Sequence, residues 1–386
     1  MTARYVFRTR SRWIVGPDAL AQLDREFRRL GAGRVLVVAS PSAARAEVVR
    51  ALLEPAWAGR TVAWFDGVVP DSPRSVVERA RDLVMDFRPD AVLALGGGSA
   101  MVTARAAVIL AGEGRPVEDL ATRYPPGRPP ESPRLLAPKI PFVAVMSTPS
   151  VAATAPGAAV RDDATGRRYE LFDPECRPTA VLVDPRVLLT APEARYRATA
   201  VATLAMAVGL LEAPAIRVNA PARADLAEAV RLLRAGVGRP GLDAADRVAL
   251  AEAALLVSRA RDAQIGTGGG LAMGIAHQLH NRWGVEHTAA VTSLLPASLA
   301  YNRPVTEVQQ GFIAELFGGR PGEDPAPLVA AALREAGYAR RLADLGVPRD
   351  LLPAVAEAAL GDWFVRSNVR PVERMDDVLS VLEAAY

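Results

Sequence analysis

The chain has 386 residues and 50% of them are hydrophobic, which is enough for two domains that each bury a sizeable core. The formal net charge is only +3, and the arginines are scattered among acidic residues, so the composition excludes a nucleic-acid groove. The single cysteine, Cys176, excludes an internal disulfide and fits a reducing cytoplasm.

Neither a signal peptide nor a membrane span is expected. Residues 1–16 carry charge but lack the apolar core of a signal peptide. The longest uncharged apolar run, at 198–211, has 14 residues and is too short to cross a bilayer, so it predicts a buried helix. We therefore expect a soluble, cytoplasmic protein that has no membrane partner.

Short β-rich runs alternate with charged, helical segments in the first half of the chain. These runs lie at 34–40, 61–65, 91–95, 141–147 and 180–184. Such alternation predicts a parallel sheet with helices on both of its faces. A segment rich in proline and glycine at 123–141 predicts an exposed loop ahead of the fourth run.

Beyond about residue 185 the β-branched runs stop. Amphipathic patterns such as those at 224–237 and 375–386 replace them. We therefore predict an α/β domain over residues 1–185 and an all-helical domain over residues 186–386.

A glycine-rich turn follows the buried run at 91–95. Gly96, Gly97, Gly98 and Ser99 stand directly before a helical segment. Glycines let the backbone approach a ligand, and the start of a helix offers N–H groups and a positive dipole end, so the turn predicts a cradle for a dinucleotide pyrophosphate. The turn is not a GxGxxG motif, and a tight turn without a ligand would use the same glycines.

Two hydroxyls follow the run at 141–147. Ser147 and Thr148 stand at the carboxyl end of this predicted strand, where ligands of open α/β sheets bind. They are therefore candidates for nucleotide binding. The alternative is that either hydroxyl caps a helix.

Five segments keep the order and spacing of one family across nearly the whole chain. The chain resembles the iron-dependent (group III) alcohol dehydrogenase family. The resemblance implies an N-terminal dinucleotide-binding α/β domain with a parallel sheet, an all-α C-terminal domain, and an active-site cleft between them, the fold shared with dehydroquinate synthases. We also expect a homodimer. The segments that carry the resemblance are GGGSAMVTAR, STPSVAATAPGAAV, LVDPRVLLTAPEARYRATAVATLAMAVG, GLAMGIAHQLHNRWGVEHTAAVTSLLPASLAYN and NVRPVERMDDVLSVLEAAY.

The resemblance also implies which residues bind the cofactor. They are Gly96, Gly97, Gly98, Ser99, Ser147, Thr148 and the basic Arg168. The family often has an aspartate that contacts the ribose hydroxyls of NAD where this chain has Ser40. Without that carboxylate a 2′-phosphate is not repelled, so the expected cofactor is either NAD or NADP. Val102, Arg105 and Thr154 depart from the family's usual aspartate, lysine and glutamate.

The metal ligands that the resemblance implies are mostly missing. The family's aspartate and three histidines fall on Ala202, Met206, Met273 and His287, so only the last is kept. Alanine cannot ligate, and a methionine thioether is a soft ligand that suits Fe(II) or Zn(II) poorly. We therefore expect no metal of the family's type. A different site made of His277, His280 and His287, which are all the histidines in the chain, stays open.

His277 matches a histidine that the family keeps in its active site without using it as a ligand. It follows Met273 by four residues and therefore shares a helix face with it. We predict that His277 donates or accepts a proton, and that His287 hydrogen-bonds the substrate. The alternative for both is a purely structural role, which is what we expect of His280.

The predicted function is that of a metal-independent, NAD(P)-dependent oxidoreductase acting on an alcohol, a carbonyl or a conjugated carbonyl compound. Its substrate is a small molecule or a peptide, because similar proteins with degenerate sites accompany daptide-type pathways that tailor ribosomally made peptides. The alternative is an inactive homologue that serves as a binding partner or structural subunit of an active dehydrogenase. A non-redox enzyme that uses bound NAD, as dehydroquinate synthase does, is a third possibility.

Overall fold

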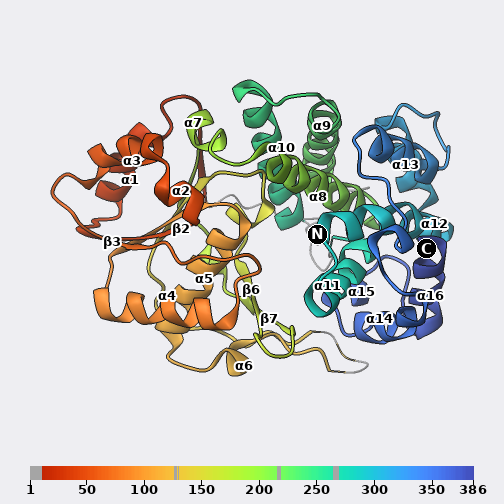
Figure 1. Cartoon of the computed structure of the whole chain (residues 1–386), viewed down its shortest axis with the longest axis horizontal. Helices are drawn as coiled ribbons and strands as arrows, with labels where there is room; N and C mark the ends of the chain where they lie inside the picture. The colour runs from red at the N-terminus through yellow and green to blue at the C-terminus, as the bar shows by residue number, and fades with distance from the viewer. Residues whose placement is uncertain (1–10, 126–127, 129, 215–218, 264–268) are drawn as a thin grey trace, which may run out of the picture. The chain divides into compact units, whose positions relative to one another are not determined.

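The computed structural model describes residues 11–125, 128, 130–214, 219–263 and 269–386 (Figure 1). It divides into two compact units. The first contains the described part of Thr9–Tyr196 together with Leu242–Ala251, and the second contains the described parts of Arg197–Gly241 and Glu252–Tyr386. The boundary expected at residues 185 and 186 therefore lies shortly before the division at Tyr196. Residues 1–10, which form most of the stretch tested for a signal peptide, lie outside the described residues.

The first unit contains a six-stranded parallel sheet, which confirms the predicted sheet and its five strands. The strand order is β1-β8-β5-β4-β2-β3. The edge strand β1 is not among the five runs predicted as strands. The strands are β1 (Arg12–Val15), β2 (Arg34–Ala39), β3 (Thr61–Phe65), β4 (Ala91–Gly96), β5 (Phe142–Met146) and β8 (Ala180–Val183).

Helices cover both faces of this sheet. Successive side chains such as Val37 and Val38 point to opposite faces, and both are fully buried. In Figure 1 the helices α1–α3 lie on one side of the sheet and α4 on the other. The helices of this unit are α1 (Leu23–Arg29), α2 (Pro41–Arg45), α3 (Glu47–Leu53), α4 (Arg74–Phe87), α5 (Gly98–Glu113), α6 (Val117–Leu120) and α7 (Pro185–Leu188).

A two-stranded antiparallel hairpin was not predicted. It consists of β6 (Gly157–Arg161) and β7 (Arg168–Phe172). Its sequences, GAAVR and RYELF, contain small and charged residues in place of β-branched runs, so no strand signal stood out. The turn between them is closed by Asp162, whose carboxylate accepts hydrogen bonds from the backbone N–H groups of Ala164 and Thr165.

A buried arginine ties this hairpin to α5. Arg105 is 1% exposed and donates to the backbone carbonyls of Ala152, Gly157 and Cys176 at 3.0–3.2 Å. These bonds hold the start of β6 and the segment before it against the helix that follows the glycine turn. Cys176 is itself buried, and burial raises the pKa of its thiol to about 12, in keeping with a structural role.

The loop expected at 123–141 has no helix or regular strand in its described part, but it is not exposed throughout. Lys139, the only lysine in the chain, is 1% exposed on its side chain. Its Nζ lies 2.6 Å from Glu113 Oε1 and 3.0 Å from Asp173 Oδ2. The end of the loop is therefore anchored in the first unit by a buried ion cluster.

The second unit is helical, and its described residues contain no strand. This confirms that the second half of the chain is nearly all helix, and none of the described helices has the length and apolar character needed to cross a membrane. The predicted buried helix at 198–211 forms part of α8. The helices that lie wholly or mostly in this unit are α8 (Glu193–Leu211), α9 (Ala220–Val237), α10 (Ala244–Ala263), α11 (Leu271–Trp283), α12 (His287–Leu316), α13 (Pro325–Glu335), α14 (Leu352–Ala359), α15 (Trp363–Arg366) and α16 (Met375–Ala384).

Gly209 brings the chain before α11 close to α8. A Cβ on Gly209 would lie 2.3 Å from the backbone oxygen of Gly269, a distance that no real side chain permits. Gly270 then starts α11 with a φ of +92°, which favours glycine. These glycines allow the start of the histidine-bearing helix to pack against α8.

Candidate functional site

The glycine turn occupies the end of β4 and the start of α5. Gly96 has a φ of +146°, and a Cβ there would lie 2.9 Å from both Ala100 Cβ and Ser40 Oγ. Gly97 is the residue that precedes α5, a helix with no acidic residue in its first turn. The turn therefore combines a backbone free of side chains with the positive end of a helix, as an anion site requires.

Hydroxyls from the segment after β5 lie over the same turn. A Cβ on Gly97 would be 2.8 Å from Thr148 Oγ1, and one on Gly98 would be 3.0 Å from Ser150 Oγ. The Ser147 N–H donates to the Gly96 carbonyl at 2.9 Å, which joins the two loops. Ser150 caps the short 3-10 helix Val151–Ala153, so neither Ser147 nor Thr148 is the cap that the alternative required.

Ser40 completes this group from β2. Its N–H donates to the Leu95 carbonyl at 2.9 Å, and it precedes α2 without a side-chain capping bond. Strands β2 and β4 are neighbours, with β3 on one side and β5 on the other, so the chain changes direction between them. Ligands of open α/β sheets bind outside the carboxyl ends of the strands at such a switch point. We call Ser40, Gly96–Ser99, Ser147 and Thr148 the nucleotide loop group.

Ser72 supports the nucleotide loop group and was missed in the sequence. Its hydroxyl donates to the Ser99 carbonyl at 3.2 Å and accepts from the Thr103 hydroxyl at 3.0 Å. Ser72 is buried and has a φ of +48°, a left-handed conformation that is unfavourable for serine. The motif PDSP that contains it signals only a turn, so no local pattern pointed to this contact.

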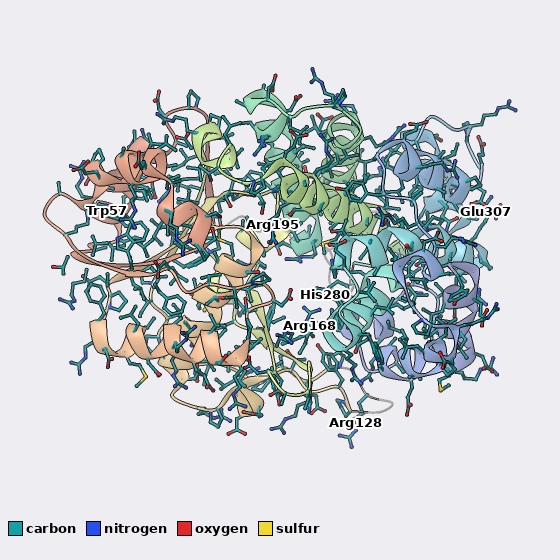
Figure 2. The ribbon with its side chains drawn as sticks, in the orientation of Figure 1. Trp57, Arg128, Arg168, Arg195, His280 and Glu307 are labelled. Carbon is teal, nitrogen blue, oxygen red and sulfur yellow. The ribbon has the colours of Figure 1, made fainter. Side chains whose placement is uncertain are left out.

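Arg168 was also predicted to bind the cofactor, but it makes no described bond to these loops. It begins β7, opposite Arg161 on β6, and it is half-buried (Figure 2). Within the described part of the chain, no hydrogen bond or ion pair joins Arg168 to the nucleotide loop group. Its assignment as a cofactor-binding residue stays a prediction.

The three histidines gather in the second unit, where α11 ends and α12 begins. The rings of His277 and His287 stack with centroids 5.6 Å apart and an interplanar angle of 23°. The rings of His280 and His287 meet edge to face at 5.7 Å. His280, labelled in Figure 2, has its Nδ1 2.8 Å from the Val285 carbonyl. Because a carbonyl only accepts, this Nδ1 donates, and His280 has the structural contact expected of it.

His277 has a carboxylate partner that the sequence did not reveal. Its Nδ1 lies 3.3 Å from Asp362 Oδ2, and both residues are buried. The ring of Phe364 meets that of His277 edge to face at 4.8 Å. Asp362 lies 85 residues further along the chain, and its local signal is that of a helix cap before Trp363. We call His277, His287 and Asp362 the imidazole cluster.

The positions matched to the family's metal ligands offer poor donors. Met206 and Met273 are buried, and a Cβ on Gly269 would lie 3.3 Å from Met206 Cγ and 3.0 Å from Phe364 Cε1. Ala202 has no donor atom, so of these four positions only His287 could ligate a hard divalent ion. The described residues contain no group of three or more His, Cys, Asp or Glu side chains arranged to hold a metal. The donor set therefore does not fit the oxygen- and nitrogen-ligated metal that the family implies.

A second buried acid in this unit was also missed in the sequence. Glu212 is 1% exposed and accepts hydrogen bonds from Asn302 Nδ2 at 3.0 Å and Gln310 Nε2 at 2.9 Å. The hydroxyl of Thr306, where α12 is kinked, lies 3.4 Å away. Burial raises the pKa of Glu212 to about 7, although these three neutral partners act in the opposite direction.

Residues 10–185 match the family described as iron-containing alcohol dehydrogenase, and residues 243–386 match the C-terminal part of the same family. The lactaldehyde reductase of Escherichia coli (strain K12) is 27% identical over 384 residues, which cover 96% of this chain and 97% of that protein. The maleylacetate reductase of Pseudomonas knackmussii is 28% identical over 387 residues, which cover 97% and 95%.

Solved structures show the same fold. A 1,3-propanediol oxidoreductase matches with a TM-score of 0.86 at 22% identity and covers 99% of this chain and 100% of its own. The maleylacetate reductase of Rhizobium sp. strain MTP-10005 matches with a TM-score of 0.77 at 24% identity and covers 99% and 98%.

Proposed function

The chain belongs to the iron-containing alcohol dehydrogenase family and is a dehydrogenase or reductase of that family, and from this premise we propose that it works with NAD or NADP and without a bound metal. The substrate is an alcohol, an aldehyde or a related carbonyl compound. The observation that carries this proposal is the nucleotide loop group, whose glycines let Ser40 and Thr148 pack directly against the backbone at the start of α5.

The nucleotide loop group supports dinucleotide binding by three kinds of contact. The glycines expose backbone N–H groups at the start of α5, which suit a pyrophosphate. Thr148 contributes a hydroxyl beside Gly97. Ser40 stands at the end of β2 without a carboxylate, so the site excludes neither a ribose 2′-hydroxyl nor a 2′-phosphate. When bound, the nicotinamide supplies or accepts a hydride.

The imidazole cluster supports the proton transfer that accompanies this chemistry. An alcohol loses a proton from its oxygen when it is oxidised, and a carbonyl oxygen gains one when it is reduced. An imidazole of His277 or His287 can accept or donate that proton. The same imidazoles can also hydrogen-bond the substrate oxygen, a task that a metal performs in metal-dependent enzymes.

The direct test is a fluorescence titration of the wild-type protein with NADH and with NADPH, followed by a screen for turnover. The screen should contain short alcohols and aldehydes, lactaldehyde, maleylacetate, and peptides that carry a carbonyl or an alcohol group. We expect saturable binding of at least one nucleotide and turnover of at least one substrate. Absence of binding of both nucleotides at millimolar concentration would contradict the proposal.

Replacing His277 by alanine should lower kcat about 100-fold, because general acid–base catalysis contributes at least this much in many enzymes. His280→Ala is the matched control, since the Val285 carbonyl engages the Nδ1 of His280 in a structural contact, and its kcat should stay close to that of the wild type. Steady-state kinetics with the best substrate of the screen measure both variants. An unchanged kcat in His277→Ala would remove this residue from the mechanism.

Metal analysis should find well under one transition-metal ion per chain after purification without added metal. The physical reason is that Ala202, Met206 and Met273 offer no hard donor beside His287. Inductively coupled plasma mass spectrometry measures the content, and turnover should survive incubation with EDTA. One tightly held ion per chain, or loss of turnover that added metal restores, would show that the metal-free proposal is wrong.

A second candidate is an inactive homologue that binds an active dehydrogenase. The loss of hard donors at three of four ligand positions favours it, since a chain without a catalytic task does not need them. If neither nucleotide binds in the titration, the inactive homologue is favoured over the enzyme. When the titration is positive, the substrate screen and the His277 variant decide.

A further inference from the structure

Asp362 is held in one orientation by several groups. Its Oδ1 accepts the Phe364 N–H at 2.9 Å, which is the N-terminal cap of α15. Its Oδ2 accepts from Gln278 Nε2 at 3.0 Å and faces His277 Nδ1 at 3.3 Å. Both oxygens are therefore engaged, and the side chain is buried. A carboxylate fixed in this way can hold the imidazole beside it in one orientation.

Gly274 allows this arrangement. It lies one helical turn before His277 on the side of α11 that meets α15. A Cβ on Gly274 would lie 2.7 Å from Val365 Cγ2, 2.9 Å from the Val365 nitrogen and 3.0 Å from Asp362 Oδ1. Only glycine at this position lets α15 come close enough for Asp362 to reach the histidine. The close packing of α11 on α15 is thus what makes the bond between His277 and Asp362 possible.

We propose that Asp362 is a positioning residue that fixes His277 in the tautomer with its proton on Nδ1. An ionised carboxylate only accepts hydrogen bonds, so the ring nitrogen that faces it must donate. A neutral imidazole has one donor nitrogen and one acceptor nitrogen, so Nε2 is the acceptor. The ring plane is set by the stacking on His287 and the edge contact with Phe364. Nε2 is therefore the nitrogen of His277 that accepts a proton in the proposed reaction.

This inference rests on the proposed function only where it concerns rate, because the tautomer itself is a property of the folded protein. In oxidation, the hydroxyl proton of an alcohol substrate moves to Nε2 of His277, while the Nδ1 proton stays in its bond to Asp362. In reduction, the same Nε2 returns that proton to the carbonyl oxygen. Asp362 touches neither substrate nor cofactor in this scheme.

The tautomer can be measured directly because the chain has only three histidines. Protein labelled with ¹⁵N-histidine gives six ring nitrogen signals, and long-range ¹H–¹⁵N correlation spectra distinguish the two tautomers. His280→Gln and His287→Gln variants assign the signals by their disappearance. We expect the Nδ1–H tautomer for His277 in the wild type. The Nε2–H tautomer of His277 in the wild type would overturn the proposal, whether or not any Asp362 variant folds.

Asp362→Asn is the informative variant. The amide oxygen can still cap α15, but the amide nitrogen can then face His277 as a donor, which drives Nδ1 to accept. We expect the proton of His277 to move to Nε2 and kcat to fall about tenfold, while KM for the nucleotide changes little. Asp362→Glu, which keeps the carboxylate, should restore part of the Nδ1–H population. Circular dichroism and thermal unfolding check that each variant is folded.

Gln278→Leu is the matched control. It removes the other side-chain bond to the same Asp362 oxygen but leaves the carboxylate facing His277. We expect the Nδ1–H tautomer and kcat to stay close to those of the wild type. A loss of rate in Gln278→Leu equal to that in Asp362→Asn, with the Nδ1–H tautomer unchanged, would overturn the proposal, because the rate would then not depend on the tautomer of His277.

The outcomes also separate this inference from the proposed function. A tautomer that moves in Asp362→Asn together with a lower kcat supports both. A tautomer that moves without any change in kcat overturns the positioning role in catalysis. If the wild-type protein turns over no substrate, the proposed function fails, and the NMR measurement alone supports or overturns the orienting contact.

Discussion

Replacement of Gly97 by aspartate should abolish the binding of NADH and NADPH at millimolar concentration. Any Cβ at this position meets Thr148 Oγ1 at 2.8 Å, so the Thr148 side chain must move away from the turn. A carboxylate there would also repel the phosphates that the start of α5 attracts. The steric and electrostatic effects act in the same direction, and we expect affinity to fall by more than about 1000-fold, or about 4 kcal/mol.

The measurement is the same fluorescence titration, with Gly238→Asp as the control. Gly238 is exposed, and a Cβ there has no atom within 4 Å, so the same glycine-to-aspartate change is made without a collision. Its affinity should equal that of the wild type. Unchanged affinity in Gly97→Asp, with a normal unfolding temperature, would place the nucleotide elsewhere and remove the main support for the proposed function.

Replacement of Glu212 by glutamine should stabilise the protein at pH 8 by about 3 kcal/mol. The carboxyl has an ordinary pKa of 4.5 and a folded-state pKa of about 7, because burial disfavours its charged form. Below pH 4.5 both states hold the proton, and folding carries no penalty from this group. As the pH rises through 7 the folded state must ionise a buried carboxyl, and the contribution to stability is lost.

Glutamine removes this penalty because it is neutral at every pH and resembles the protonated carboxyl in shape. Its oxygen can accept from Asn302 or Gln310, which are neutral donors themselves. Urea unfolding between pH 5 and pH 8 measures the difference between variant and wild type, which should shrink below about 1 kcal/mol at pH 5. Glu307→Gln, an exposed site on α12, is the control and should show no such dependence. A constant difference across this range would mean that Glu212 keeps its ordinary pKa.

The parallel sheet could be predicted because it is buried on both faces. Strands such as β2 and β4 are then continuous apolar runs, which stand out in any sequence. The hairpin β6–β7 has no such run, and its strands form because Arg105 and Asp162 organise the backbone around them. Its existence depends on contacts that are far apart in the sequence, so local patterns did not reveal it.

In the candidate site, too, some residues could be predicted from the sequence and others could not. The glycines of the nucleotide loop group could be identified from the sequence because a strand, a turn and a helix follow one another there. The supporting contacts of Ser72 and Ser150 could not, since serine in a turn has many ordinary uses. Arg168 was assigned through the resemblance alone, and its place on β7 adds no contact that supports the assignment.

The sequence by itself determined which side chains stand at the positions that the resemblance matches to metal ligands. Ala202 has no donor atom, and the thioethers of Met206 and Met273 are poor ligands for a hard ion in any fold, so the proposal of a metal-free enzyme rests on the sequence. Only the tertiary structure decided which residues surround His277. Asp362 is an ordinary acidic residue in the sequence, and its burial, its partners and the close approach allowed by Gly274 arise from the packing of helices that are distant along the chain.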